Sequence, residues 1–187
     1  RVRCTGCGDE LLVAFSCKRR GVCPSCCARR ASDVAAHLVD HVLPRGPYRQ
    51  WTLSLPIRLR WALARNAALC TAVLNLFVRT LFNALRARAR SLALPARACG
   101  AVSFIQRFGS ALQLNVHFHV LVPEGLFDDD GTFHPLPPPE DVEVESLLAT
   151  FLRRLVPLLE RHGLQELEAL PEHALDALQL SSAASAS

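Results

Sequence analysis

The sequence has no methionine, a single lysine and a single tyrosine. Since an open reading frame begins with Met and this chain begins inside a cysteine motif, we expect a fragment that is truncated at both ends. Long uninterrupted apolar runs are also missing. The longest apolar stretch, residues 69–85, contains Asn75, Arg79 and Asn83, so we do not expect it to cross a membrane.

The amount of apolar sequence indicates a folded chain. The protein has 187 residues, half of them hydrophobic, which suits one medium domain or two small ones with a sizeable core. This composition excludes a chain that is disordered throughout. Local loose segments are expected at the proline-rich stretches and in the Ser/Ala-rich tail, residues 181–187.

Charge is divided unevenly along the chain. Residues 1–110 carry 17 Arg and one Lys against four acids, a net charge of +14, whereas residues 111–187 carry three Arg against 13 acids, a net charge of −10. A basic half of this size indicates a polyanionic partner, most commonly nucleic acid. Arg outnumbers Lys 20 to one, which suits bidentate phosphate contacts; a GC-rich genome would give the same bias.

The cysteines are clustered near the start of the chain. Cys4 and Cys7 form one CxxC pair, and Cys23 and Cys26 form a second pair after 15 intervening residues. Such pairs in a sequence without secretory features indicate metal ligands before disulfides, and each can direct two thiolates at one ion. We therefore predict a structural Zn²⁺ bound by these four residues. Cys17 could replace a member of either pair, and the neighbouring Cys27 could compete with Cys26.

Basic side chains flank these cysteines. Lys18, Arg19 and Arg20 precede the second pair, and Arg29 and Arg30 follow it. We predict that they contact DNA phosphates. The alternative is a solvated charged face with no ligand.

The remaining sequence predicts a mixture of helices and strands. Periodicity and turn residues predict helices at 31–43, 61–90 and 140–162, strands at 50–55, 101–108 and 112–122, and a loop at 123–139. A Pro/Gly cluster at 44–47 divides the chain into a zinc ribbon plus helix (1–45) and a second domain (46–187). The fold class is α+β. The second domain follows the order of an incomplete ferredoxin-like unit, β-α-β-β-α, with its last strand not supplied.

Two histidines alternate in the last predicted strand. His117 and His119 are separated by one residue, so they project from the same face while Phe118 points to the other. Two imidazoles on one face suit a divalent metal ion when a third ligand completes the site. A half-buried face without any ligand is the alternative.

Several long motifs resemble those of a known family, the rolling-circle insertion-sequence transposases of the two-tyrosine HUH class, in particular the IS91-like group. The resemblance covers most of residues 4–140, with its motifs in the family's order. It rests on Cys4-x-x-Cys7-Gly8, residues 13–18, Cys23-Pro24-Ser25-Cys26, Arg29-Arg30, and residues 36–44, 50–56, 104–112 and 115–119.

The resemblance implies a zinc-binding domain followed by a partial HUH domain, over residues 46–187, that nicks single-stranded DNA and transfers the strand. In this family two histidines, here His117 and His119, hold Mg²⁺ or Mn²⁺, and a tyrosine forms a 5′-phosphotyrosine link. It further implies transposon-end DNA as the partner, no membrane, and a bacterial cytoplasmic location at the nucleoid. The oligomeric state stays open.

The sequence departs from the family at the nucleophile. The family's tyrosines follow the histidine motif, whereas Tyr48 precedes it, so we assign Tyr48 no catalytic role and expect the nucleophile downstream and this chain alone to be inactive. Gln106 is the candidate third metal ligand, and Glu124 and residues 128–130 are weaker ones. The pair His37 and His41 is expected at a helix surface or a DNA contact before a second metal site, and the surface histidines are His134, His162 and His173.

Two other functions remain compatible with these residues. One is a non-catalytic zinc-ribbon module that binds DNA and uses its second half as an interaction scaffold. The other is a small metalloenzyme unrelated to DNA, in which His117 and His119 act with a carboxylate.

Overall fold

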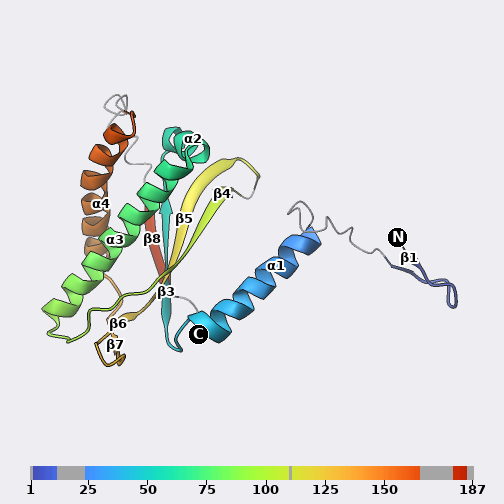
Figure 1. Cartoon of the computed structure of the whole chain (residues 1–187), viewed down its shortest axis with the longest axis horizontal. Helices are drawn as coiled ribbons and strands as arrows, with labels where there is room; N and C mark the ends of the chain where they lie inside the picture. The colour runs from blue at the N-terminus through green and yellow to red at the C-terminus, as the bar shows by residue number, and fades with distance from the viewer. Residues whose placement is uncertain (1, 12–23, 110, 165–178, 185–187) are drawn as a thin grey trace. The chain divides into compact units, whose positions relative to one another are not determined.

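A computed structural model describes residues 2–11, 24–109, 111–164 and 179–184. The chain divides into two compact units, residues 1–45 and residues 46–187, which are described one at a time (Figure 1). The protein is an α+β protein with antiparallel sheets.

The first unit holds a short hairpin and a helix. Strands β1 (Val2–Arg3) and β2 (Glu10–Leu11) pair antiparallel, and helix α1 spans Pro24–His37 before one π-helical turn, Leu38–Val42. Proline is favoured at the first position of a helix because its fixed φ suits the helix and its missing N–H has no partner there. The helix therefore begins earlier than the predicted start at residue 31.

The second unit is built on a four-stranded antiparallel sheet. Its strands are β3 (Tyr48–Ser54), β4 (Val102–Phe108), β5 (Leu114–Pro123) and β8 (Gln179–Ala184), in the spatial order β4-β5-β3-β8. The expectation that the last strand is not supplied is wrong, because β8 pairs with β3 along six residue pairs. Its small and polar residues gave no strand signal, and part of the tail that was predicted to be loose forms this strand.

Three helices lie between these strands in the described part of the second unit. They are α2 (Ile57–Arg65), α3 (Ala67–Ser91) and α4 (Asp141–Arg161). The single helix predicted for 61–90 is interrupted at Asn66, whose extended backbone ends α2 and whose side chain accepts the Leu69 N–H at 2.9 Å as the N-cap of α3. Helix α4 runs through Pro157 without a break.

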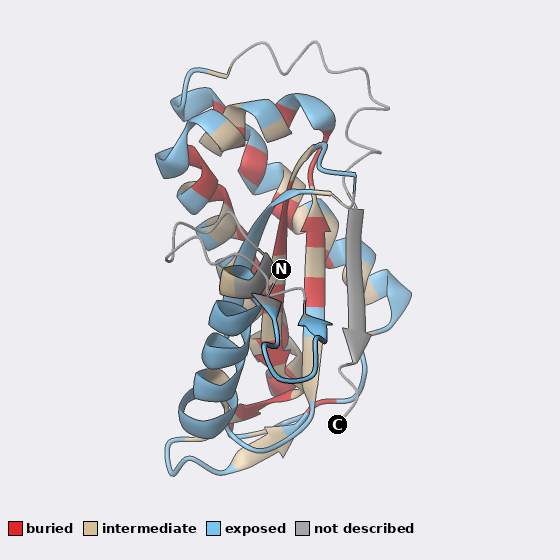
Figure 2. Cartoon of the chain, turned by 90° about the vertical axis from the view of Figure 1, so that its right-hand side faces the viewer, coloured by how far each residue is buried: buried red, intermediate tan, exposed pale blue. Residues whose placement is uncertain are grey.

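The helices and one face of the sheet bury the core of this unit. Alternation places Trp51 and Leu53 of β3 beside Val120 and Phe118 of β5. The buried helical side chains that pack with them include Leu69, Val73, Phe77 and Leu81 of α3 and Leu147, Phe151 and Leu155 of α4. Figure 2 shows this alternation as buried and intermediate residues along the strands. By length and composition α3 could cross a membrane, but its buried face forms part of this core, which is typical of a core helix in a folded domain.

The predicted loop at 123–139 contains a small hairpin, β6 (Gly125–Phe127) paired with β7 (Phe133–Pro135). Gly125 is required there because a Cβ at that position would overlap the carbonyl oxygen of His134. The hairpin begins two residues after β5, at the end of that strand that is farther from His117 and His119.

Candidate metal centres

The first CxxC pair lies in the turn between β1 and β2. The Cys4 N–H donates to the carbonyl of Asp9 at 2.8 Å, and the Gly8 N–H donates to the carbonyl of Cys4 at 3.1 Å. Gly8 has a φ of +78°, which glycine adopts without strain. This turn presents Cys4 and Cys7 as exposed side chains.

The turn also favours the thiolate form of Cys4. Hydrogen bonds from the backbone of Cys7, and then of Gly6, lower the pKa of the Cys4 thiol. A thiolate is the form that binds a metal ion, so the donor chemistry fits Zn²⁺. Cys26 is the third residue of α1, so it lies in the first turn of that helix. Cys17 and Cys23 lie outside the described residues.

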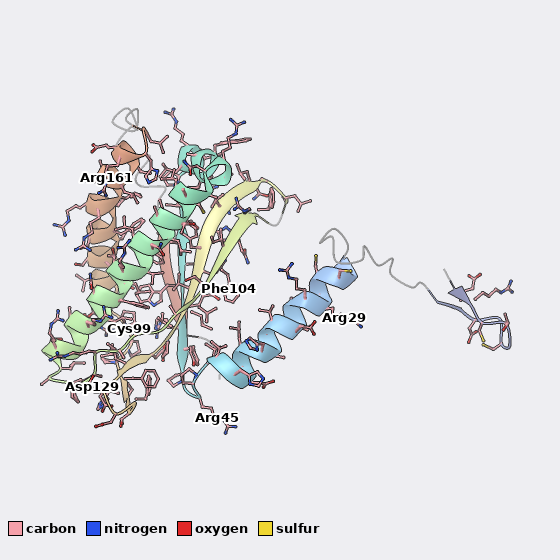
Figure 3. All side chains as sticks on the ribbon, in the orientation of Figure 1. Arg29, Arg45, Cys99, Phe104, Asp129 and Arg161 are labelled. Atoms are coloured by element: carbon pink, nitrogen blue, oxygen red, sulfur yellow. The ribbon has the colours of Figure 1, made fainter. Side chains whose placement is uncertain are left out.

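The predicted DNA-contact residues fall in two groups. Lys18, Arg19 and Arg20 lie outside the described residues. Arg29 and Arg30 are exposed on α1, and Figure 3 labels Arg29. Residues 27–37 of α1 are exposed throughout, so this helix offers its basic side chains to solvent (Figure 2).

The second candidate centre lies on β5, on the sheet face opposite the core. His117 stands across from Ser54 of β3 and Gln106 of β4, and His119 stands across from Thr52 and Phe104. The two imidazole rings lie 4.9 Å apart between centroids and are tilted by 69°. His117 is 9% exposed, while Phe118 between them is fully buried in the core. The predicted common face of the two histidines is therefore confirmed.

One ring nitrogen of His117 is fixed by the backbone. Nδ1 lies 2.7 Å from the carbonyl oxygen of Asn115. A carbonyl can only accept, so Nδ1 carries the proton and Nε2 of the neutral ring keeps a lone pair. This is the usual arrangement of a metal-ligating histidine, whose second nitrogen donates to an outer partner.

His119 is oriented by two side chains that the sequence did not single out. Its Nδ1 lies 3.2 Å from the hydroxyl oxygen of Thr52 and 3.0 Å from the amide nitrogen of Gln50. The hydroxyl can accept from Nδ1–H, which leaves the lone pair on Nε2, whereas an amide nitrogen can only donate and selects the other tautomer. The sequence shows the alternation of residues 50, 52 and 54 along one strand. It does not show that this strand pairs with β5, where His119 lies 67 residues after Thr52.

Two buried polar atoms on this strand have no hydrogen-bond partner within the described part of the chain: Nε2 of His119 and Oδ1 of Asn115. Asn115, like His117 and His119, belongs to the alternate positions of β5 that face away from the core. Unpartnered buried donors or acceptors are rare in folded proteins and call for an explanation. Sequence reasoning missed Asn115, although its spacing of two from His117 was the available signal.

Burial, and then the neighbouring His117, lower the pKa of His119. His119 is therefore neutral at pH 7 and can offer a lone pair. Two imidazoles with an amide oxygen on the same strand suit a transition-metal ion such as Mn²⁺ better than Mg²⁺, which prefers an all-oxygen shell.

The weaker third-ligand candidates are engaged elsewhere. Glu124 pairs with Arg49 at 2.6 Å. Asp128 accepts the N–H groups of Asp130 and Thr132 at 3.0 and 2.8 Å and pairs with His134 at 2.8 Å. These hydrogen bonds, that of His134 first, lower the pKa of Asp128. No group of three or more His, Cys, Asp and Glu side chains converges among the residues that the structure describes.

Within the second unit, Tyr48 lies apart from the His117–His119 pair. Tyr48 pairs with Pro123 at the far end of β3, four residues along the strand from Thr52, which corresponds to about 13 Å. Burial raises the pKa of Tyr48. His37 and His41 lie together at the end of α1, with ring centroids 5.3 Å apart. His162 is exposed at the end of α4, and His173 lies outside the described residues.

Two family models match the chain. Residues 1–55 match the model described as "Transposase zinc-binding domain", and residues 100–185 match the model described as "Putative transposase". The search of curated proteins and the search of solved structures gave no match. The first match shows that the N-terminal part of the chain is a zinc-binding domain, so the predicted Zn²⁺ is confirmed, while the choice of its four cysteines stays a prediction.

Proposed function

Because the chain belongs to the IS91-like transposases, we propose that it binds single-stranded transposon-end DNA and supplies the metal centre at which the complete protein nicks and transfers a strand. The proposal places the catalytic divalent ion on His117 and His119 and the structural Zn²⁺ on Cys4, Cys7, Cys23 and Cys26. It also places the protein in the bacterial cytoplasm, at the nucleoid.

The strand order supports an HUH nuclease fold. The described residues of the second unit have the chain order β-α-β-β-α-β, apart from the small hairpin and the division of the first helical segment into α2 and α3. In the sheet the first strand lies beside the third, and the fourth lies at the edge. A ferredoxin-like unit has this chain order. The proposed fold puts the two histidines in the middle of the sheet, on the face away from the helices.

The observation that carries the proposal is the pair of histidine rings on one face of β5, 4.9 Å apart between centroids. Nε2 of His117 is available because Nδ1 donates to a backbone carbonyl, and Nε2 of His119 is buried without a partner in the described chain. Asn115 adds an unpartnered amide oxygen from the same strand, and Gln106 stands opposite His117. We propose that one of these two amides completes the site.

The bound ion would supply Lewis-acid chemistry, polarising the scissile phosphate and stabilising charge on its oxygens. The chain's own part is to hold the two imidazole rings in fixed orientations through their Nδ1 atoms. In the proposed reaction a tyrosine hydroxyl, for which Tyr48 is not the candidate, attacks phosphorus. The P–O3′ bond breaks, the hydroxyl proton passes to the leaving 3′ oxygen, and a 5′-phosphotyrosine link remains. Because the link conserves the phosphodiester bond, the strand can be joined elsewhere without ATP.

Charge supports a nucleic-acid partner. Residues 46–123 contain ten Arg and no Asp or Glu, and they include β3, α2, α3, β4 and β5. Such a surface attracts phosphates and releases counterions on binding, so the affinity should fall steeply with salt.

A second candidate function is a non-catalytic zinc-binding module that binds DNA. It is favoured by one observation: the described residues bring no carboxylate to the two histidines. The two functions differ in whether the His117–His119 face binds a divalent ion.

Calorimetric titration of the full zinc-loaded chain with Mn²⁺ separates them. We expect one Mn²⁺ per chain, weakened by at least about 100-fold in His117→Ala and in His119→Ala, since loss of a ligand costs more than loss of its outer partner. His134→Ala, which removes a histidine paired with Asp128, is the matched control and should bind as wild type. Equal Mn²⁺ binding by all four proteins would contradict the catalytic proposal and leave the binding module.

A further inference from the structure

Helix α2 exposes a tryptophan that the metal site and the core do not use. Trp61 is 57% exposed, whereas the other tryptophan, Trp51, is 3% exposed in the core. Ile57, one turn earlier on α2, is 66% exposed. Single exposed apolar residues are common on protein surfaces. A large aromatic ring that a helix exposes to solvent is, in addition, suited to binding a flat ligand by stacking.

A basic side chain accompanies Trp61. The guanidinium of Arg65, one turn later on the same helix, lies 5.7 Å from the centre of the indole ring. This cation–π contact orients the ring and keeps a positive charge beside it. Arg58 is also exposed on α2, and the nearest acidic residues in the sequence are Asp40 and Glu124.

The C-terminal end of α2 lies beside β4, the strand that pairs with the histidine-bearing strand β5. Arg107 of β4 donates to the carbonyl oxygen of Ala64 at 3.4 Å. Its neighbour Gln106 stands opposite His117. The strand β4 is an edge of the described sheet, so a chain that passes over this edge can reach both Trp61 and the histidine face.

We propose that Trp61 and Arg65 form a stacking site for an unpaired nucleobase of single-stranded DNA, a few nucleotides from the phosphate at the His117–His119 face. The inference rests on the proposed DNA-binding function and adds the residue that holds a base. The indole stacks on the base, and Arg65 meets the adjoining phosphate. Unpaired bases have free faces, whereas the bases of a duplex are already stacked on one another, so the site selects single strands.

The arrangement of the two tryptophans provides a direct readout. Trp51→Phe leaves Trp61 as the sole tryptophan of the full chain. Titration of this zinc-loaded variant with short oligothymidylate should quench Trp61 emission, with the same midpoint as fluorescence anisotropy of labelled DNA. A duplex of equal length should quench it much less. Equal quenching by duplex and single strand would overturn the stacking site.

Affinity measurements on the otherwise wild-type chain complete the test. Trp61→Ala should weaken oligothymidylate binding about tenfold or more, and Trp61→Phe should keep most of the affinity, as expected for stacking. Ile57→Ala, at an exposed apolar position on the same helix, is the matched control and should bind as wild type.

The outcomes separate this inference from the proposed function. Unchanged affinity of Trp61→Ala, with wild-type protein binding DNA, overturns the stacking site and leaves the proposed function intact. If the DNA affinity of Trp61→Ala is unchanged and sedimentation shows altered self-association, the Trp61 side chain makes a protein contact. This result also overturns the stacking site. Failure of the wild-type chain to bind single-stranded DNA at all removes the proposed function and the inference together.

Discussion

Removal of zinc should unfold the first unit and leave the second folded. None of the large buried hydrophobic residues in the described chain lies in residues 1–45; all of them belong to the second unit. An isolated helix as short as α1, 14 residues, is marginal in water, and a metal-dependent module of this size derives most of its folding free energy from the ion. The four helices of the described residues contain 69 α-helical residues, 14 of them in α1, so about a fifth of their helical signal should be lost.

The assay is far-ultraviolet circular dichroism of the full chain during titration with a zinc chelator, followed by a thermal melt. We expect the partial loss of helical signal and a melting transition of the second unit that stays in place. Cys4→Ser should give the same partial loss without chelator, and Cys99→Ser, in the second unit, should not. A signal unchanged by chelation, or the loss of both units together, would refute the reasoning.

Three further predictions concern the second unit. Thr52→Val should weaken Mn²⁺ binding by about tenfold, because it removes the acceptor for His119 Nδ1–H. Gln50→Ala removes a competing donor, so this variant should bind Mn²⁺ as tightly as wild type or more so. Calorimetry that ranks the two variants in reverse order would contradict the proposed tautomer of His119. Phe77→Ala should lower the free energy of unfolding, measured in urea, by about 3–5 kcal/mol, because Phe77 is fully buried against Phe151. Val142→Ala, at an exposed site, should lower it by less than about 0.5 kcal/mol. Equal losses would show that α3 is not a core helix. Without metal, the free energy of unfolding should fall as pH drops below about 6.5. The reason is that the lowered pKa of His119 makes the unfolded chain bind a proton there more readily than the folded chain. His119→Ala should lose this pH dependence, and a variant that keeps it would contradict the assignment to His119.

Local patterns predicted the parts of the fold that depend on local sequence. The alternation around Phe118 correctly placed His117 and His119 on one face, because side-chain direction in a strand depends on the residue's position alone. The long apolar periodicity of α3 was also recognised. Its start was missed, because the capping hydrogen bond of Asn66 outweighed an uninterrupted helical pattern.

The features that depend on distant pairing could not be predicted. Strand β8 has few strand-forming side chains, and its conformation is stabilised by hydrogen bonds to β3, more than 100 residues earlier. In the same way Thr52 and Gln50 reach His119 only because β3 pairs with β5. The groups that orient the candidate metal ligands therefore follow from sheet register rather than from any motif.

The most direct test of the metal centre is pulsed electron paramagnetic resonance of Mn²⁺ bound to the zinc-loaded chain. The proposed site predicts magnetic coupling to nitrogens of two imidazoles, reduced to one in either His117→Ala or His119→Ala. A bound Mn²⁺ without imidazole nitrogen coupling would contradict the assignment of His117 and His119 as its ligands.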